Sequence, residues 1–394
     1  MKKLFLLLTS AALIAAAASC NKVENPVEQS EEGEYTEVTF NVNVDGVDVQ
    51  TRAAGNLEGV ESENKLTKVD IFVFEHSSGK LAAYKQYDAN QISADGGMTM
   101  KLKTAVSYTI YAVANHYDPL GTIDKESGLS AWKFYLDNDN VCIKNSYGLQ
   151  MMSEPVVKAF TADDKSLTIT VNRIAARVRL VKVTNNLPAA AGDVTIKNVF
   201  LSNVAGEWSD AEDFECETWY NKFGRTLNIM TDYADGRENV RYEFSFVNAD
   251  YAECYPAAFQ SLAIDDTEVR IEATGSYTTP VSLYCYANNS TTVPDGFNNQ
   301  YTTWEAFAGQ HTMLVVETEI GGETYYYPID LNKRIVDNAG GCPGIERNKT
   351  YDVSLTINNY GSPDEPNREI STLTAGYTVA VGEWGDGGTI DADF

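Results

Sequence analysis

The first side chain whose sequence context suggests a chemical reaction is Cys20, which follows three small residues, Ala-Ala-Ser, at positions 17–19. Lys2 and Lys3 give the start of the chain a positive charge, and residues 4–18 are apolar except for one Thr-Ser pair. Such a run is too short to span a bilayer and has the order of a secretory signal. A lipidated cysteine after small residues is typical of bacterial lipoproteins. We therefore expect residues 1–19 to be removed and Cys20 to carry lipid; the alternative is an ordinary cleavage site beside an unrelated cysteine.

Residue spacing indicates no catalytic or metal site. The three histidines, His76, His116 and His311, do not have the spacing of zinc ligands, and His116 is interpreted as a turn residue rather than a base. The motifs of zinc proteases, serine hydrolases and phosphate-binding loops are absent. Asp137–Asn140 offers oxygen ligands but lacks the twelve-residue loop of a calcium hand, and a solvated turn is expected there. We expect no enzyme, no metal and no cofactor.

The charge of the chain excludes one class of partner. The formal net charge is −26, and removal of Lys2 and Lys3 with the signal takes it to −28. A nucleic-acid-binding protein needs a basic face, so no nucleic-acid partner is expected. Besides Cys20 there are five cysteines, an odd and scattered set that does not form a dense disulfide framework. Their pairing cannot be assigned from sequence: Cys142, Cys216, Cys254, Cys285 and Cys342.

Alternating apolar and polar residues predict an all-β chain. The first such run follows an acidic, polar segment, residues 20–34, which is expected to be an extended tether. The run places Val38, Phe40, Val42 and Val44 on one face. The same period recurs in twelve further runs: Lys68–Glu75, Met98–Lys103, Tyr108–Asn115, Ser166–Asn172, Ala176–Thr184, Asp193–Asn203, Val240–Phe246, Glu268–Ala273, Val281–Ala287, Met313–Glu319, Thr324–Leu331 and Tyr351–Ile357. Helical periodicity is limited to a turn or two at Thr303–Gly309.

The order of three short motifs carries the functional hypothesis. Arg52 lies in the segment Gln-Thr-Arg-Ala-Ala-Gly soon after the first predicted strand. Arg173 and Arg177 belong to Arg-Ile-Ala-Ala-Arg-Val, which closes the first half. Glu-Arg-Asn-Lys-Thr-Tyr-Asp-Val at 346–353 leads into a late strand, and a final apolar segment ends in Gly-Glu-Trp at 382–384. With the lipoprotein signal, this order resembles the fimbrillin family, the major subunits of type V pili, over essentially the whole chain.

The resemblance implies a fold, a location and a set of partners. It implies two tandem transthyretin-like β-sandwich domains, over residues 35–185 and 186–394. The sequence itself places the internal boundary at Asn185–Asp193, where Pro188 and a run of alanines suggest a linker. The resemblance further implies a precursor tethered to the outer membrane by its lipid and cut after Arg52, before Ala53, by an arginine-specific protease. The product would be a cell-surface fimbrium of other copies and accessory pilus subunits, acting in adhesion or biofilm, with a host protein or glycan as a further ligand.

The resemblance also implies polymerisation by strand exchange. The cut would remove residues 35–52 and open a groove for a strand from another subunit. The tail 370–394 has a matching apolar face, formed by Leu373, Ala375, Tyr377, Val379 and Val381. Burial of such a face contributes on the order of 6–12 kcal/mol before entropic costs. The alternative is that this tail is an ordinary strand of its own domain.

Two alternative functions stay open at this point. The first is a tip or anchor subunit of the same pilus. The second, from another class, is a surface glycan-binding lipoprotein, in which aromatic side chains would stack on sugar rings. The candidate aromatic residues are Trp208, Trp219, Tyr325, Tyr326 and Tyr327, and packing between strands accounts equally for each of them.

Overall fold

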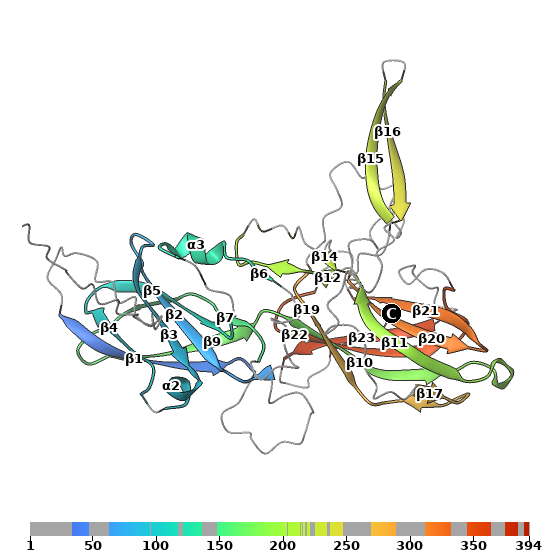
Figure 1. Ribbon diagram of the computed structural model, residues 1–394, viewed down its shortest axis with the longest axis horizontal. Coiled ribbons are helices and arrows are strands. Elements are labelled where there is room, and N and C mark those ends of the chain that lie inside the picture. The colour runs from blue at the N-terminus through green and yellow to red at the C-terminus, as the bar shows by residue number, and fades with distance from the viewer. Residues whose placement is uncertain are drawn as a thin grey trace, which may run out of the picture.

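The computed structural model describes a chain of two lobes, each built on β-sheets (Figure 1). It describes residues 34–46, 63–94, 96–116, 120, 122–135, 148–202, 204–212, 214, 216, 219–220, 225–234, 237–246, 269–288, 312–331, 345–363, 375–384 and 390–393. Strands form nearly all of its regular structure, so the predicted all-β class is confirmed. The predicted turn at Thr303–Gly309 lies outside the described residues.

The first lobe is one eight-stranded sheet, in the order β3-β2-β5-β7-β9-β1-β4 with β8 also paired to β5. Its strands are β1 (Tyr35–Val44), β2 (Lys68–Glu75), β3 (Leu81–Asp88), β4 (Thr99–Lys103), β5 (Ser107–Ala114), β7 (Met151–Ser153), β8 (Val156–Ala159) and β9 (Ser166–Arg173). The two ends of the sheet meet, because Lys85 and Tyr87 of β3 donate side-chain hydrogen bonds to the Thr99 carbonyl of β4, at 3.0 and 2.7 Å. The sheet thus curls around its own apolar core.

Two five-residue helices lie in this lobe, α2 (Ala89–Ser93) and α3 (Glu126–Ser130). Asp88 starts α2 with a capping box: its carboxylate accepts from the amides of Asn90 and Gln91, and the Gln91 side chain accepts from the Asp88 amide. Asn115 ends β5 at a positive φ of 56°, and its buried amide donates to the carbonyls of Lys65 and Leu149. These bonds fix the helix start and the loops around Asn115 within the first lobe.

The second lobe packs a six-stranded sheet, β18-β10-β22-β23-β24 with β19 also on β10, against a four-stranded sheet, β17-β11-β20-β21. The first contains β10 (Ala176–Asn185), β18 (Ser276–Tyr277), β19 (Val281–Cys285), β22 (Lys349–Ile357), β23 (Ala375–Glu383) and β24 (Ile390–Asp393). The second contains β11 (Val194–Ser202), β17 (Val269–Ile271), β20 (Met313–Ile320) and β21 (Glu323–Asp330). A 3₁₀ turn, η1 (Ala189–Ala191), precedes β11. All the alternating runs of the sequence that fall here form strands.

The strand pairing of β10 favours a domain boundary earlier in the chain than the predicted one at Asn185–Asp193. β10 pairs with β18, β19 and β22, so Ala176–Asn185 belongs to the sheet of the second lobe. Pro188 and the alanine run that suggested a linker instead form the short connection from β10 to β11. We therefore propose the domain boundary between Arg173 and Ala176, where β9 ends and β10 begins.

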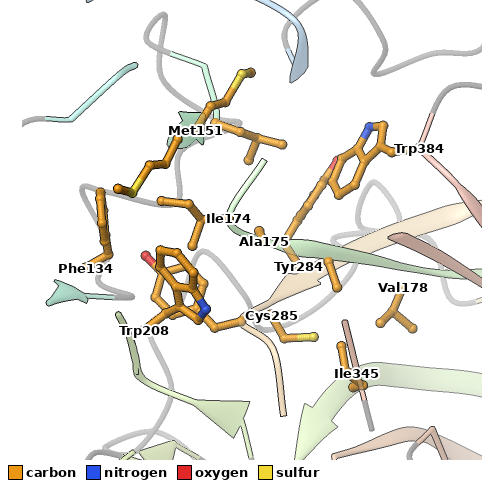
Figure 2. Close-up of a cluster of buried hydrophobic side chains, with 14 of the residues drawn as sticks. Phe134, Met151, Ile174, Ala175, Val178, Trp208, Tyr284, Cys285, Ile345 and Trp384 are labelled. Carbon is orange, nitrogen blue, oxygen red and sulfur yellow. The ribbon is translucent and has the colours of Figure 1, made fainter. Parts of the chain in front are cut away.

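Several contacts join the lobes. β6 (Phe134–Tyr135) from the first half pairs with β13 (Glu207–Trp208) from the second, and one buried apolar cluster includes residues of both. Figure 2 shows Phe134 facing Trp208, with ring centres 5.6 Å apart. Two further ribbons complete the second half, one of β12 (Val204–Ala205) with β14 (Trp219–Tyr220) and one of β15 (Arg225–Ala234) with β16 (Arg237–Phe246). The β15–β16 hairpin projects away from both lobes (Figure 1).

Candidate functional site

The first strand lies inside its sheet rather than at an edge. β1 pairs in parallel with β9 over Thr39–Val44 and antiparallel with β4 over Tyr35–Thr39. The four residues predicted to face the core point into it: Val38, Phe40 and Val44 are buried, and Val42 is half-buried and packed against the core. Removal of β1 would therefore leave β4 and β9 with unpaired backbone groups along an apolar slot.

Two buried arginines and one tryptophan meet where the lobes join. Arg173 ends β9 and Arg177 lies in β10. Their guanidinium carbons lie 4.9 and 4.8 Å from the ring centre of Trp384, close enough for cation–π attraction. Tyr284 stacks on the same indole with ring centres 5.9 Å apart. Figure 2 shows this pair beside Ala175, the residue that directly precedes β10.

Glu63 supplies the carboxylate for this group and is only 1% exposed. Its Oε2 atom accepts hydrogen bonds from Arg177 Nη1 at 2.7 Å and from Trp384 Nε1 at 3.1 Å. Its Oε1 atom accepts from the Tyr284 hydroxyl at 2.5 Å. Both oxygens are thus occupied. We call Glu63, Arg173, Arg177, Tyr284 and Trp384 the arginine cluster.

The end of β1 is tied to the arginine cluster through Asp45. Arg173 Nη1 donates to the Asp45 carbonyl at 3.1 Å and to Asn348 Oδ1 at 3.0 Å, and Arg173 Nη2 donates to Asn64. Asn348 Nδ2 donates to Asp45 Oδ2 at 2.7 Å. Asn348 has a positive φ of 58°, which asparagine tolerates better than most residues, and it leads directly into β22. The first strand, β9 and β22 therefore share one polar network.

Burial and charge act against each other in this network. Burial lowers the pKa of Arg173 to about 10; the Glu63 and Asp45 carboxylates oppose that shift, and the Arg177 guanidinium adds to it. Burial also raises the pKa of Tyr284 well above its usual value, and the adjacent Glu63 carboxylate contributes in the same direction. Two guanidiniums taken out of water are stable only while such carboxylates stay beside them.

Replacing Glu63 by Gln is expected to lower the free energy of unfolding by about 3–5 kcal/mol, because the Arg177 charge then stays buried without a counter-ion. Urea denaturation measures the change. Glu154→Gln is the matched control: it breaks the ion pair of Glu154 with Arg347, in which the Glu154 side chain is 65% exposed, and should cost under about 1 kcal/mol. Equal losses in the two variants would contradict a structural role for the buried pair.

The predicted cleavage residues, Arg52 and Ala53, lie outside the described residues, as does Cys20. The described residues before and after the predicted cleavage site nevertheless contact the same polar network. Asp45, before them, and Glu63, after them, both contact the network at the lobe junction. Neither acid was a candidate from the sequence, since each has its partners more than a hundred positions away.

The predicted donor segment is a strand of its own lobe in this monomer. β23 pairs antiparallel with β22 along its whole length. Ala375 and Val379 are buried, while Tyr377 and Val381 are half-buried and packed against the core; Leu373 lies outside the described residues. In this conformer the tail is therefore an ordinary strand of its own domain, as in the alternative interpretation. The donor role stays a prediction, since exchange would require β23 to leave β22.

Two of the aromatic candidates for sugar stacking have a structural role. Trp208 and Tyr327 are buried in the core, and Trp219 belongs to β14, opposite Ala205. One pair is more accessible: Tyr325 of β21 lies against Tyr360, with ring centres 5.1 Å apart, and Tyr360 is 44% exposed. Tyr326, which lies between Tyr325 and Tyr327 on β21, is half-buried.

Of the remaining candidates for chemistry, some are buried, His76 is an exposed turn residue, and others lie outside the described residues. His116 is 1% exposed, and Trp132 Nε1 donates to its Nε2 at 3.2 Å; His76 Nδ1 bonds the Thr109 hydroxyl. Cys285 is a fully buried thiol, and burial raises its pKa to about 12. Cys216 is half-buried beside the core. Outside the described residues lie His311, Asp137–Asn140, Cys142, Cys254 and Cys342.

The described part of the chain contains neither a candidate metal site nor a candidate membrane-spanning helix. No group of three or more His, Cys, Asp or Glu side chains is arranged to hold a metal ion in the part of the chain that the structure describes. Among the same residues, no helix is long and apolar enough to cross a membrane.

Comparison with known proteins gives a family match over the first half of the chain. Residues 36–199 match the family model described as major fimbrial subunit protein (FimA). Over these residues, the chain is similar to the fimbrillin family. The fimbrillin match includes β1, Arg52, Arg173 and Arg177 and ends within β11, so Asn348 and Trp384 lie beyond it. It confirms the resemblance seen in the sequence.

Solved structures share the fold across both lobes. A fimbrilin from Porphyromonas gingivalis is 15% identical, with 88% of this chain and 98% of that chain covered and a TM-score of 0.51. A protein proposed to act in cell adhesion from Bacteroides eggerthii is 16% identical, with 91% and 98% covered and a TM-score of 0.54. A similar protein from Parabacteroides distasonis is 16% identical, with 90% and 100% covered and a TM-score of 0.53. No curated protein matches this chain.

Proposed function

We propose that this protein is a structural subunit of a fimbrium, which polymerises by strand exchange after a cut at Arg52. The family model that matches residues 36–199 describes a fimbrial subunit, and the fold of both lobes resembles a fimbrilin. The observation that carries the proposal is the position of β1: it is an internal, buried strand that precedes Arg52 in the chain. One cut in the segment after β1 therefore separates this strand from the rest of the chain. Its departure leaves a groove between β4 and β9.

The proposed precursor is an outer-membrane lipoprotein. Cys20 carries the lipid, and residues 20–34 separate it from the first strand. Because Cys20, residues 20–34 and β1 all precede Arg52, one cut by an arginine-specific protease releases the subunit from its lipid and opens the groove. The acidic charge of the chain keeps neighbouring copies soluble until they join.

The proposed product is a chain of copies linked by donated strands. A groove between β4 and β9 offers unpaired backbone groups and the pockets of Val38, Phe40 and Val44, the features that favour strand addition. β23 of a second copy is the proposed donor, with accessory subunits at the ends of the pilus. A cleavage residue together with a donor segment favours a stalk subunit over a tip or anchor subunit. The role is structural, in adhesion or biofilm, rather than enzymatic.

Glycan binding is a second candidate, favoured by one observation. The Tyr325–Tyr360 pair is accessible on the second lobe and offers an aromatic surface to a sugar ring or another ligand. A glycan-binding lipoprotein would stay monomeric and bind polysaccharide. A stalk subunit would instead form heat-resistant ladders on gels only when the protease is present.

The Cys20→Ser variant tests the lipoprotein part of the proposal. It is expected to incorporate no labelled palmitate and to be lost from the membrane fraction, because the thiol is the acylation site. Cys216→Ser is the control and should retain the label. Continued labelling of the Cys20 variant would sink this part of the proposal.

N-terminal sequencing of the mature surface form then tests the cut. A polymerised subunit is expected to begin at Ala53, and an uncut lipoprotein at Cys20. A polymer whose subunits still begin at Cys20 would show that β1 stays in place and that assembly uses another contact.

A further inference from the structure

The charge balance at the lobe junction depends on β1. Arg173 and Arg177 are 1% and 7% exposed, and two carboxylates act on them, Glu63 and Asp45. Glu63 follows Arg52 in the chain and stays after a cut there, whereas Asp45 precedes it and leaves with β1. The cut thus leaves two buried guanidiniums beside one carboxylate.

The remaining carboxylate is near both arginines, but its hydrogen bonds go to Arg177, Trp384 and Tyr284 rather than to Arg173. Glu63 Oε2 already accepts from Arg177 and Trp384, and its Oε1 accepts from Tyr284. Loss of Asp45 also removes the carbonyl that accepts from Arg173 and the carboxylate oxygen that accepts from the Asn348 side chain. An unpaired buried cation strongly disfavours the state that contains it. The open groove therefore has a cationic end as well as an apolar floor.

We propose that the strand which replaces β1 must bring an acidic side chain to Arg173 and Asn348, just after its last buried apolar residue. This inference rests on the proposed strand exchange and adds a rule for which strands fit. An apolar strand without that acid fills the pockets of Val38, Phe40 and Val44 but leaves Arg173 and Arg177 with one nearby carboxylate, Glu63, in place of two. The groove thereby selects its partner by charge as well as by apolar pattern.

A second copy of this chain carries a segment that meets the rule. In β1, Phe40–Asp45 has apolar residues at alternate positions and ends in an acid. In β23, Tyr377–Glu383 has the same alternation, with its acid one position later on a side chain longer by one methylene. The register that puts Tyr377 in place of Phe40 puts Glu383 in place of Gly46, one residue past Asp45 at the cationic end. We commit to Glu383 of a second copy as the replacing carboxylate.

The test follows release of β1 from the full chain. The protein is cut after Arg52 with an arginine-specific protease, and dissociation of the N-terminal fragment is timed by size-exclusion chromatography. Asp45→Ala should speed that dissociation about 10-fold, the scale of one lost hydrogen bond to a charged group, because the half-buried Asp45 carboxylate accepts from the Asn348 side chain and lies near Arg173. Asn43→Ala, exposed on the same strand, should leave the rate unchanged.

The same cut protein is then offered two synthetic peptides of residues 375–383, one wild-type and one with Glu383→Gln. The wild-type peptide is expected to bind roughly 30-fold more tightly. Equal binding of the two peptides, or equal release of β1 from the Asp45→Ala and Asn43→Ala proteins, would overturn the charge rule while leaving strand exchange intact. If β1 remains bound in every cut protein and neither peptide enters, strand exchange fails and the rule fails with it.

A double-mutant cycle on the uncut protein checks the pairing without any exchange. Asp45→Ala should lower the urea midpoint in the wild-type background and have little effect in the Arg173→Met background, because the buried charge is then gone. The same loss in both backgrounds would show that Asp45 acts only on its own loop, which contradicts the charge rule.

Discussion

The Arg52→Ala variant is expected to remain a full-length, lipid-tethered monomer and to form no polymer. The resident strand then stays covalently joined to the chain, with Val38, Phe40 and Val44 in their pockets. An incoming strand would have to displace a strand whose effective concentration is far higher than its own. Ladders on unboiled gels and sequencing of the N-terminus measure the result.

Two controls separate the cut from the loss of a positive charge. Arg52→Lys keeps the charge but is no substrate for an arginine-specific protease, so it should behave like the alanine variant. Arg270→Ala removes an arginine whose side chain is 72% exposed, and should polymerise normally. A recognition site for a different protease at positions 50–54 should restore polymers when that protease is added. Normal polymers from Arg52→Ala would mean that the groove is opened elsewhere or never.

The sequence predicts the strands that have one buried and one exposed face. The first strand is of this kind, because burial alternates along Val38–Val44 and the side-chain period of a strand is two. β3 (Leu81–Asp88) was not predicted. It is an edge strand whose residues are mostly half-buried on both faces. Its sequence therefore shows no alternation of apolar and polar residues.

The candidate site was predictable only in part. Arg173, Arg177, Asn348 and Trp384 belong to the three motifs whose order indicated the family, and the structure brings them together. Their acidic partners could not be found from the sequence. A lone Glu or Asp beside a turn is usually solvated, and what makes Glu63 different is burial against chain segments that are distant in sequence.

The structure also shows contacts that the proposed donor strand, β23, makes within its own lobe and that the sequence does not reveal. β23 is held on one side by β22 and on the other by β24, and Trp384 at its end is fixed by Glu63. A strand that is donated must first break these contacts. Truncation after Thr372 cannot isolate the donor role, because it also deletes the buried side chains of Val379 and Trp384.

A reversible lock on β23 separates donation from folding. Ser354 of β22 and Thr378 of β23 are directly opposed in the register, and Thr378 is exposed. A disulfide between cysteines at these two positions should leave the monomer folded, since the strands are already neighbours there.

The oxidised Ser354→Cys/Thr378→Cys protein is expected to be cut after Arg52 but to form no polymer, because β23 cannot leave β22. Reduction should restore ladders in the same sample, and each single-cysteine variant should polymerise with or without oxidant. Thermal melting before the cut checks that the locked monomer is at least as stable as the unlocked one. If the locked protein polymerises as fast as the reduced one, β23 is not the donor, and the strand that fills the groove comes from another part of the chain or from another subunit.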